Sequence, residues 1–130
     1  MSIVVRDLSY RYPYSERDVI QGVDLRVDRE EFVLLVGRSG CGKTVTLKVI
    51  LGLMKPDSGE VWVDGRDVTK LDQDELNEVR KKIGVLFQSS ALFDSLTVGE
   101  NVAFMLNQHT DLPKEEIKKI VAEKLSLIHI

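Results

Sequence analysis

Gly37-Arg38-Ser39-Gly40-Cys41-Gly42-Lys43-Thr44 is the most informative run in this chain of 130 residues. A glycine, four residues and then Gly-Lys-Thr form a pattern typical of loops that bind phosphate. Before it, residues 32–36 are apolar and β-branched and predict a buried parallel strand. After it, apolar residues recur at near-helical spacing and predict a helix that begins at about Lys43. The sequence therefore predicts an α/β fold with a phosphate loop between a strand and a helix.

The residue types of this loop suit a polyanion. Glycines allow a sharp turn in which successive backbone N–H groups point inward and form an anion nest. The N-terminus of the following helix adds unpaired donors and a partial positive charge. Lys43 is expected on the outer phosphates, and Thr44 offers the hydroxyl that this motif places on Mg²⁺. The alternative interpretation is a chance glycine-rich turn.

The composition of the chain excludes several classes of protein. The formal net charge is −3, which argues against a dedicated nucleic-acid binder, so we expect no nucleic-acid partner. Cys41 is the one cysteine, which excludes an internal disulfide and a multi-cysteine metal site. No apolar run approaches the ~20 residues that span a bilayer, and the N-terminus lacks the features of a signal peptide. We therefore expect a cytoplasmic protein.

The remaining patterns in the first two thirds of the chain predict antiparallel strands and a second helix. Residues 3–12 and 19–27 alternate loosely and read as strands, with Val23, Leu25 and Val27 on one face. Residues 55–59 carry proline and turn residues that should end the first helix. Residues 61–63 alternate ahead of an Asp64-Gly65 hairpin signal. Residues 72–82 predict a short charged helix with a solvated face.

The last third predicts one more strand and two helices. Residues 83–87 are a second candidate for a buried strand, which ends at Gln88-Ser89-Ser90. Thr97 and Glu100 form a capping-box pattern, so a helix is expected from about Val98 to Leu106. Pro113 suits the first turn of a final helix, whose apolar positions share one face.

With these parts in place, residues 1–124 resemble the N-terminal half of the ATP-binding domain of ABC transporters. The phosphate loop has the form that this family favours, Gly-x-Ser-Gly-x-Gly-Lys-Thr, and residues 83–88 resemble its strand ending in the glutamine loop. The resemblance implies a P-loop NTPase of ABC type, with an antiparallel β subdomain and part of a RecA-like parallel sheet core. Residues 86–98, 100–104 and 109–113 resemble more narrowly the ATPase subunit of Mla-type phospholipid transporters.

The resemblance also implies roles for individual residues, with ATP and Mg²⁺ as cofactors. Tyr12 falls where the family places an aromatic ring on adenine, although Tyr10 or Tyr14 could be that ring and Tyr12 could simply pack on the sheet. Gln88 matches the glutamine whose side-chain oxygen reaches Mg²⁺ or the attacking water. Catalytic roles are thereby implied for Lys43 and Gln88, and metal contacts for Thr44 and Gln88. The nucleotide-binding residues implied are Tyr12, Gly37, Arg38, Ser39, Gly40, Cys41, Gly42, Lys43 and Thr44.

The implied partners are a transmembrane permease, reached through the region after Gln88, and a second ATP-binding subunit. The implied location is the cytoplasmic face of the inner membrane, where the protein would energise phospholipid trafficking across a bacterial envelope. The alternative is a non-transport ABC-type ATPase or a nucleotide-dependent regulatory protein. Another phosphate-loop kinase or GTPase is also considered, and the absence of Asn-Lys-x-Asp weighs against the GTPase.

The chain departs from the family pattern in several places. Glu30-Glu31 stands where the family has Gly-Glu, and a positive φ at Glu30 would be strained. The Leu-Ser-Gly-Gly-Gln signature, a second strand ending in Asp-Glu and the switch histidine are absent, since His109 and His129 lie in other contexts. Weak or no ATP hydrolysis is expected from residues 1–130 alone. Without further strands, the apolar edges should favour association.

Residues 125–130, Leu-Ser-Leu-Ile-His-Ile, are expected to be a non-native tail. One codon choice for them reproduces the end of a transposon adapter used in DNA sequencing, and such segments are excluded from fold reasoning. The alternative is a natural, leucine-rich helix end.

Overall fold

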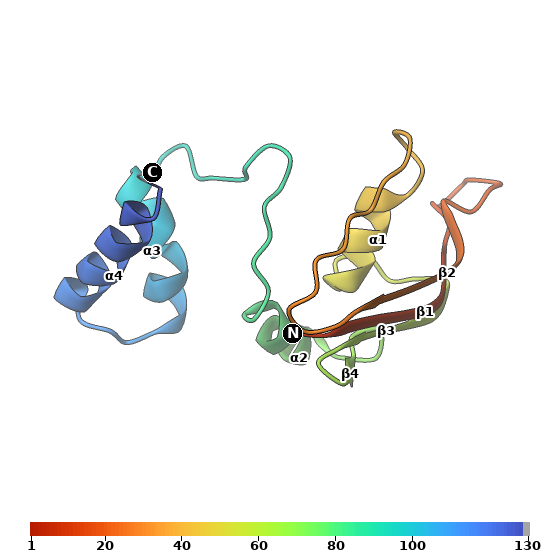
Figure 1. The fold of residues 1–130 in the computed structure, drawn as a ribbon, viewed down its shortest axis with the longest axis horizontal. Helices are drawn as coiled ribbons and strands as arrows, with labels where there is room; N and C mark the ends of the chain where they lie inside the picture. Colours follow the sequence, from red (N-terminus) through yellow and green to blue (C-terminus); the bar gives the residue numbers. More distant parts are fainter. Residues whose placement is uncertain (129–130) are drawn as a thin grey trace. The chain divides into compact units, whose positions relative to one another are not determined.

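The computed structural model describes residues 1–128 and divides the chain into two compact units, Met1–Gly84 and Val85–Ile130 (Figure 1). The first unit holds a four-stranded antiparallel sheet with two helices. The second holds two further helices. Each unit is described by itself.

The sheet of the first unit has the strand order β2-β1-β3-β4. Its strands are β1 (Ile3–Tyr10), β2 (Ile20–Val27), β3 (Ser58–Val63) and β4 (Arg66–Asp67). Val5 of β1 lies opposite Leu25 of β2 and Val61 of β3, so the middle of the sheet is apolar on one face. The three predicted antiparallel segments are confirmed. The Asp64-Gly65 hairpin is confirmed as well, with φ of 47° and 80° at its two central residues.

A bulge in β1 explains why two inward residues are three positions apart. Val5 and Leu8 are both fully buried, which strict alternation forbids. Asp7 has a φ of 46°, and the register with β2 shifts between Val5 and Leu8. The backbone of the bulge lies so close to Gly59 of β3 that a Cβ there would overlap the Asp7 carbonyl oxygen. A residue-by-residue alternation pattern cannot show such a bulge.

Helices α1 (Lys43–Ile50) and α2 (Gln73–Arg80) contribute to the core of this unit. The core holds Val5, Leu8, Ile20, Val45, Val49, Ile50, Val61, Val63, Val68, Leu76 and Val79. Helix α1 begins where predicted. It ends earlier than predicted, because Gly52 (φ 66°) turns the chain well before Pro56. The N–H of Leu53 donates to the Lys48 carbonyl and that of Gly52 to the Val49 carbonyl, which is a Schellman motif.

The two parallel strands expected from the sequence are not formed. Residues 32–36 and 83–87 belong to no strand, and most of their side chains are exposed. No ladder hydrogen bond to either segment occurs within the described residues. An apolar, β-branched run becomes a strand only when neighbouring backbone satisfies its N–H and C=O groups, and here no neighbour does so. The expectation of a buried parallel sheet is therefore wrong for these described residues.

The second unit contains α3 (Val98–His109) and α4 (Lys114–Ser126), joined by a short loop. The capping box is confirmed: the Thr97 Oγ1 accepts from the Glu100 N–H, and the Glu100 Oε2 accepts from the Thr97 N–H at 2.7 Å. Helix α3 runs three residues beyond the predicted end. Pro113 is the N-cap of α4, and Ile117 is its buried apolar residue. Helix α4 enters the suspected tail, whose origin stays a prediction, and His129 lies outside the described residues.

Candidate functional site

Two glycines shape the predicted phosphate loop. Gly40 and Gly42 have φ of 78° and 100°, a region that side chains disfavour. Gly42 is also the N-cap of α1 and is buried against the start of β2. A Cβ at Gly42 would lie 2.5 Å from the Ile20 Cγ2 and 3.0 Å from the Val19 carbonyl oxygen. The loop therefore turns tightly into α1 because only glycine fits between that helix and the sheet.

Lys43 folds back over the loop. Its Nζ donates to the carbonyl oxygens of Gly37 at 2.7 Å and Arg38 at 2.8 Å, and it lies 3.6 Å from the Cys41 Sγ. The ammonium group therefore already sits at the centre of the loop, held by neutral acceptors. A phosphate oxygen would be a stronger acceptor, because charge-assisted hydrogen bonds exceed neutral ones. Its predicted place on the outer phosphates of a nucleotide stays a prediction.

The loop leaves several main-chain donors open. Within the described residues, the N–H groups of Gly40, Gly42, Lys43 and Thr44 donate to no protein acceptor. The first helical donor with a partner is Thr46, whose N–H and hydroxyl both bond the Gly42 carbonyl, at 2.9 and 2.8 Å. Unpaired donors at a helix N-terminus, next to a lysine, form an anion site. The residues present thus fit a phosphate group.

Thr44 suits the metal role predicted for it. Its residue is exposed at the first turn of α1, and the hydroxyl that donates to the Gly42 carbonyl is that of Thr46, not that of Thr44. No cluster of three His, Cys, Asp or Glu side chains in residues 1–128 could hold a metal on its own. A hard cation here would therefore depend on hydroxyl, amide and phosphate oxygens, which are ligands that Mg²⁺ accepts.

Tyr12 is half-exposed, and its ring meets that of Tyr10 edge to face at 5.4 Å between centroids. Its segment is tied to the phosphate loop by Val19, whose N–H bonds the Tyr10 carbonyl and whose own carbonyl lies against Gly42. Tyr14 is fully exposed and has no ring partner among the described residues. Tyr12 therefore presents a ring that Tyr10 supports and that is about half-exposed, which suits stacking on a planar ligand.

Asp18 stabilises the segment next to Tyr12 through an ion pair with Arg11. The Arg11 Nε donates to the Asp18 Oδ1 at 2.7 Å, and this hydrogen bond, with the charge of Asp18, raises the pKa of Arg11. The Arg11 N–H also donates to the Asp57 carboxylate at 2.7 Å. These contacts fix the backbone next to Tyr12. The sequence alone does not predict these contacts, because Arg11, Asp18 and Asp57 match no local pattern.

Gln88 belongs to the second unit, and the phosphate loop belongs to the first. It occupies a tight turn in which the Ser90 N–H donates to the Phe87 carbonyl at 2.9 Å. Ser90 and Ala91 follow with φ of 64° and 52°. The side chain of Gln88 is exposed. Its role toward Mg²⁺ stays a prediction.

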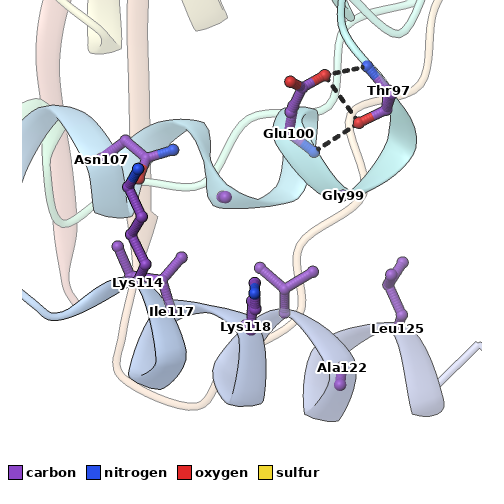
Figure 2. Close-up of a pocket in the computed structure, with 11 residues that line it drawn as sticks. Thr97, Gly99, Glu100, Asn107, Lys114, Ile117, Lys118, Ala122 and Leu125 are labelled. Carbon is purple, nitrogen blue, oxygen red and sulfur yellow. Dashed lines mark hydrogen bonds between the residues drawn. The ribbon is translucent and has the colours of Figure 1, made fainter.

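A groove between α3 and α4 is a second concave surface, and the sequence analysis did not anticipate it. It encloses about 610 Å³ within the second unit. Figure 2 shows the Thr97–Glu100 capping box at one end of α3 and Lys114, Ile117 and Lys118 projecting from α4. Hydrogen bonds from the Thr97 backbone and hydroxyl lower the pKa of Glu100. Glu100 is therefore an ionised cap of the helix.

Comparison with known proteins identifies the family. Residues 20–130 match the ABC transporter family. The chain belongs to this family. It is 40% identical over 126 residues to the intermembrane phospholipid transport system ATP-binding protein MlaF of Haemophilus influenzae. It is 42% identical over 127 residues to the methionine import ATP-binding protein MetN of Carboxydothermus hydrogenoformans. In both alignments 97% of this chain is covered.

Solved structures show the same ABC cassette fold. A dimeric post-hydrolysis state of the ATP-binding cassette MJ0796, bound to ADP and Pi, matches with a TM-score of 0.86 and 34% identity. The match covers 95% of this chain and 56% of the MJ0796 chain. A bacterial Atm1-family ABC exporter with ATP bound matches with a TM-score of 0.70 and 26% identity, over 79% of this chain and 17% of that one. The predicted α/β fold of an N-terminal cassette half is confirmed.

This ABC family chain spans about half the length of the relatives it matches: 47% of MlaF and 37% of MetN. Among residues 1–128, no helix combines the length and apolar character that crossing a membrane requires.

Proposed function

We propose that this chain is the nucleotide-binding part of an ABC transporter ATPase subunit and that residues 37–44 hold the phosphates of Mg-ATP. The main support is the phosphate loop, where the N–H groups of Gly40, Gly42 and Thr44 have no acceptor among the described residues and the Lys43 ammonium donates to carbonyls of the same loop. A triphosphate would draw Lys43 from the Gly37 and Arg38 carbonyls, because a charged acceptor outcompetes two neutral ones. Arg38, Ser39 and Cys41 complete the backbone cradle.

We propose further binding roles for Thr44, Tyr12 and Gln88. The Thr44 hydroxyl would reach Mg²⁺, and the half-exposed Tyr12 ring would stack on adenine. Gln88 would contribute its amide oxygen to Mg²⁺ or to the attacking water. Phosphoryl transfer to water depends mainly on positioning and on charge stabilisation by lysine, Mg²⁺ and backbone donors. Lys43 and Gln88 are the groups of this chain that would act in that step.

Hydrolysis at full rate would require groups that residues 1–130 lack. The chain has no Leu-Ser-Gly-Gly-Gln sequence and no second apolar strand ending in Asp-Glu. We therefore propose that the chain binds ATP but turns it over weakly or not at all by itself. A complete transporter would also contain a second ATP-binding subunit and a transmembrane permease. The region after Gln88 would contact the permease. The assembly would lie at the cytoplasmic face of the inner membrane.

Phospholipid is the cargo that we propose for that transporter. Its support is the resemblance of residues 86–98, 100–104 and 109–113 to Mla-type ATPases, together with the similarity to MlaF. MetN is similar to the same degree, so overall identity does not favour either cargo. A chimera tests the proposal: residues 1–124 replace the matching part of Haemophilus influenzae MlaF. Phospholipid transport by the MlaF chimera would support the proposed cargo. Loss of phospholipid transport by the MlaF chimera, together with methionine import by the equivalent MetN chimera, would overturn it.

Nucleotide binding is tested directly with the 130-residue chain. Fluorescent ATP plus Mg²⁺ should give saturable binding, and Lys43→Ala should weaken it by about tenfold or more, since a hydrogen bond to a charged group contributes roughly 1.5–3 kcal/mol. Lys48→Ala is the matched control, because Lys48 is an exposed lysine on the same helix. No saturation, or equal binding by the Lys43 and Lys48 variants, would contradict the proposal.

A further inference from the structure

The loop that joins β1 to β2 is closed at its base by two adjacent contacts. The Val19 N–H donates to the Tyr10 carbonyl at 2.8 Å. One position further into the loop, the Arg11 Nε donates to the Asp18 Oδ1 at 2.7 Å. Tyr12 is therefore the first residue of the loop beyond the ion pair. A loop closed by two successive bonds opens less easily than a loop closed by one.

Asp57 holds the start of the same loop from the segment that precedes β3. Its carboxylate accepts from the Arg11 N–H at 2.7 Å, and its own N–H donates to the Ser9 carbonyl at 3.0 Å. Arg11, Asp18 and Asp57 all line one polar hollow of about 440 Å³. Two carboxylates from different segments thus hold Arg11, one through its main chain and the other through its guanidinium group.

On its other side, Tyr12 begins a tight turn. The Ser15 N–H donates to the Tyr12 carbonyl at 3.0 Å. Pro13 occupies the second position of this turn, and Tyr14 occupies the third with a φ of 67°. Both features are those of a type II turn. The backbone of Tyr12 is therefore held before and after the ring, and the ring itself rests against Tyr10.

The base of the loop also contacts the phosphate loop. A Cβ at Gly42 would lie 3.0 Å from the Val19 carbonyl oxygen, so the residue that closes the loop lies against the N-cap of α1. The position of Tyr12 relative to residues 37–44 consequently depends on how well the loop is closed. A ring that is held in place before the ligand arrives binds without the entropy cost of being ordered.

We propose that Asp18 and Asp57 are positioning residues for the nucleotide base: through Arg11 they hold the Tyr12 ring where it stacks on a base whose phosphates occupy residues 37–44. This inference rests on the proposed function, since it needs both the phosphate site and the stacking role of Tyr12. It goes further by assigning part of the base-dependent affinity to two carboxylates that would contact neither base nor phosphate. A polyphosphate without a base should be indifferent to both.

The affinity test compares ATP with inorganic tripolyphosphate, each with Mg²⁺, by isothermal titration calorimetry of the 130-residue chain. Asp18→Ala should weaken ATP binding roughly two- to fivefold, because loss of an exposed ion pair shifts the closure of the loop by about that factor. Tripolyphosphate binding should not change. An equal loss for both ligands, or an unchanged affinity for ATP, would overturn the proposal.

Asp28→Ala is the matched control for Asp18→Ala. Asp28 accepts the equivalent hydrogen bond, from the Arg26 Nε at 2.9 Å, at the opposite end of β2 from the loop. Its removal should leave the affinities for ATP and tripolyphosphate unchanged. A loss of ATP affinity equal to that of Asp18→Ala would contradict a specific role for Asp18.

A double-mutant cycle with Tyr12 separates positioning from general stability. Tyr12→Ala should weaken ATP roughly five- to 150-fold, since stacking of a base on an aromatic ring contributes about that factor, and should spare tripolyphosphate. Asp18→Ala added to Tyr12→Ala should cause no further loss, because Asp18 acts through the ring. If the two losses multiply instead, Asp18 does not act through Tyr12 and the proposal is wrong.

Hydrogen exchange without nucleotide tests the loop closure itself. In Asp18→Ala and in Asp57→Ala, the amides of residues 11–19 should exchange roughly two- to fivefold faster, while those of β3 keep their native rates and verify the fold. Native exchange of residues 11–19 in both variants would overturn the proposal. Failure of the proposed function looks different: the native chain would bind neither ATP nor tripolyphosphate, and the inference would then be wrong as well.

Discussion

Gly42 determines how closely α1 approaches the sheet. Its φ is 100°, and a Cβ there would overlap Ile20 and touch the Val19 carbonyl. We predict that Gly42→Ala lowers the free energy of unfolding by about 3 kcal/mol, since backbone strain and overpacking add. Gly40→Ala is the matched control, because Gly40 also has a positive φ but has open space around its Cα, and it should cost about 1 kcal/mol. Urea titrations compare the two, and equal losses would contradict the packing argument.

Helix α3 depends on its capping box. Removing the hydroxyl in Thr97→Ala should reduce helix stability by about 1 kcal/mol. The pKa of Glu100 is lowered in the folded chain by its bonds to Thr97, so its stabilising effect is complete above its ordinary value of 4.5 and is lost as the pH falls toward the folded value. Helicity measured by circular dichroism should therefore decline in acid. Glu100→Gln, which keeps an acceptor but no ionisable group, should remove that part of the decline; an unchanged acid profile would contradict it.

Two exposed segments without helix or strand separate the stable parts of this molecule. They are residues 32–36, within the first unit, and residues 85–96, at the start of the second; Phe32, Leu86 and Leu92 are 89%, 87% and 67% exposed. Few backbone hydrogen bonds protect these segments, so local opening there costs little. We predict that brief chymotrypsin treatment cuts first within these two ranges, as mass spectrometry of the early products will show. First cuts inside β1 or α1 would contradict this picture.

Local patterns anticipated most of the elements. The antiparallel strands, the start of α1 at Lys43, the Asp64-Gly65 hairpin and the Thr97–Glu100 cap all lie where the sequence predicts them. Glu30 also has the positive, strained φ considered for it, at 62°. Each of these features depends on residues within a few positions of one another, or on burial of one apolar face. The phosphate loop likewise carries its chemistry within eight residues.

Other features depended on contacts between distant segments. The β1 bulge against Gly59 and the close contact of Gly42 with Ile20 have no local signature. The same cause explains the two runs that were predicted to be strands and are not. Their composition favours strands, but the ladder hydrogen bonds of a strand come from backbone far away in sequence, and in residues 1–128 no such backbone pairs with them.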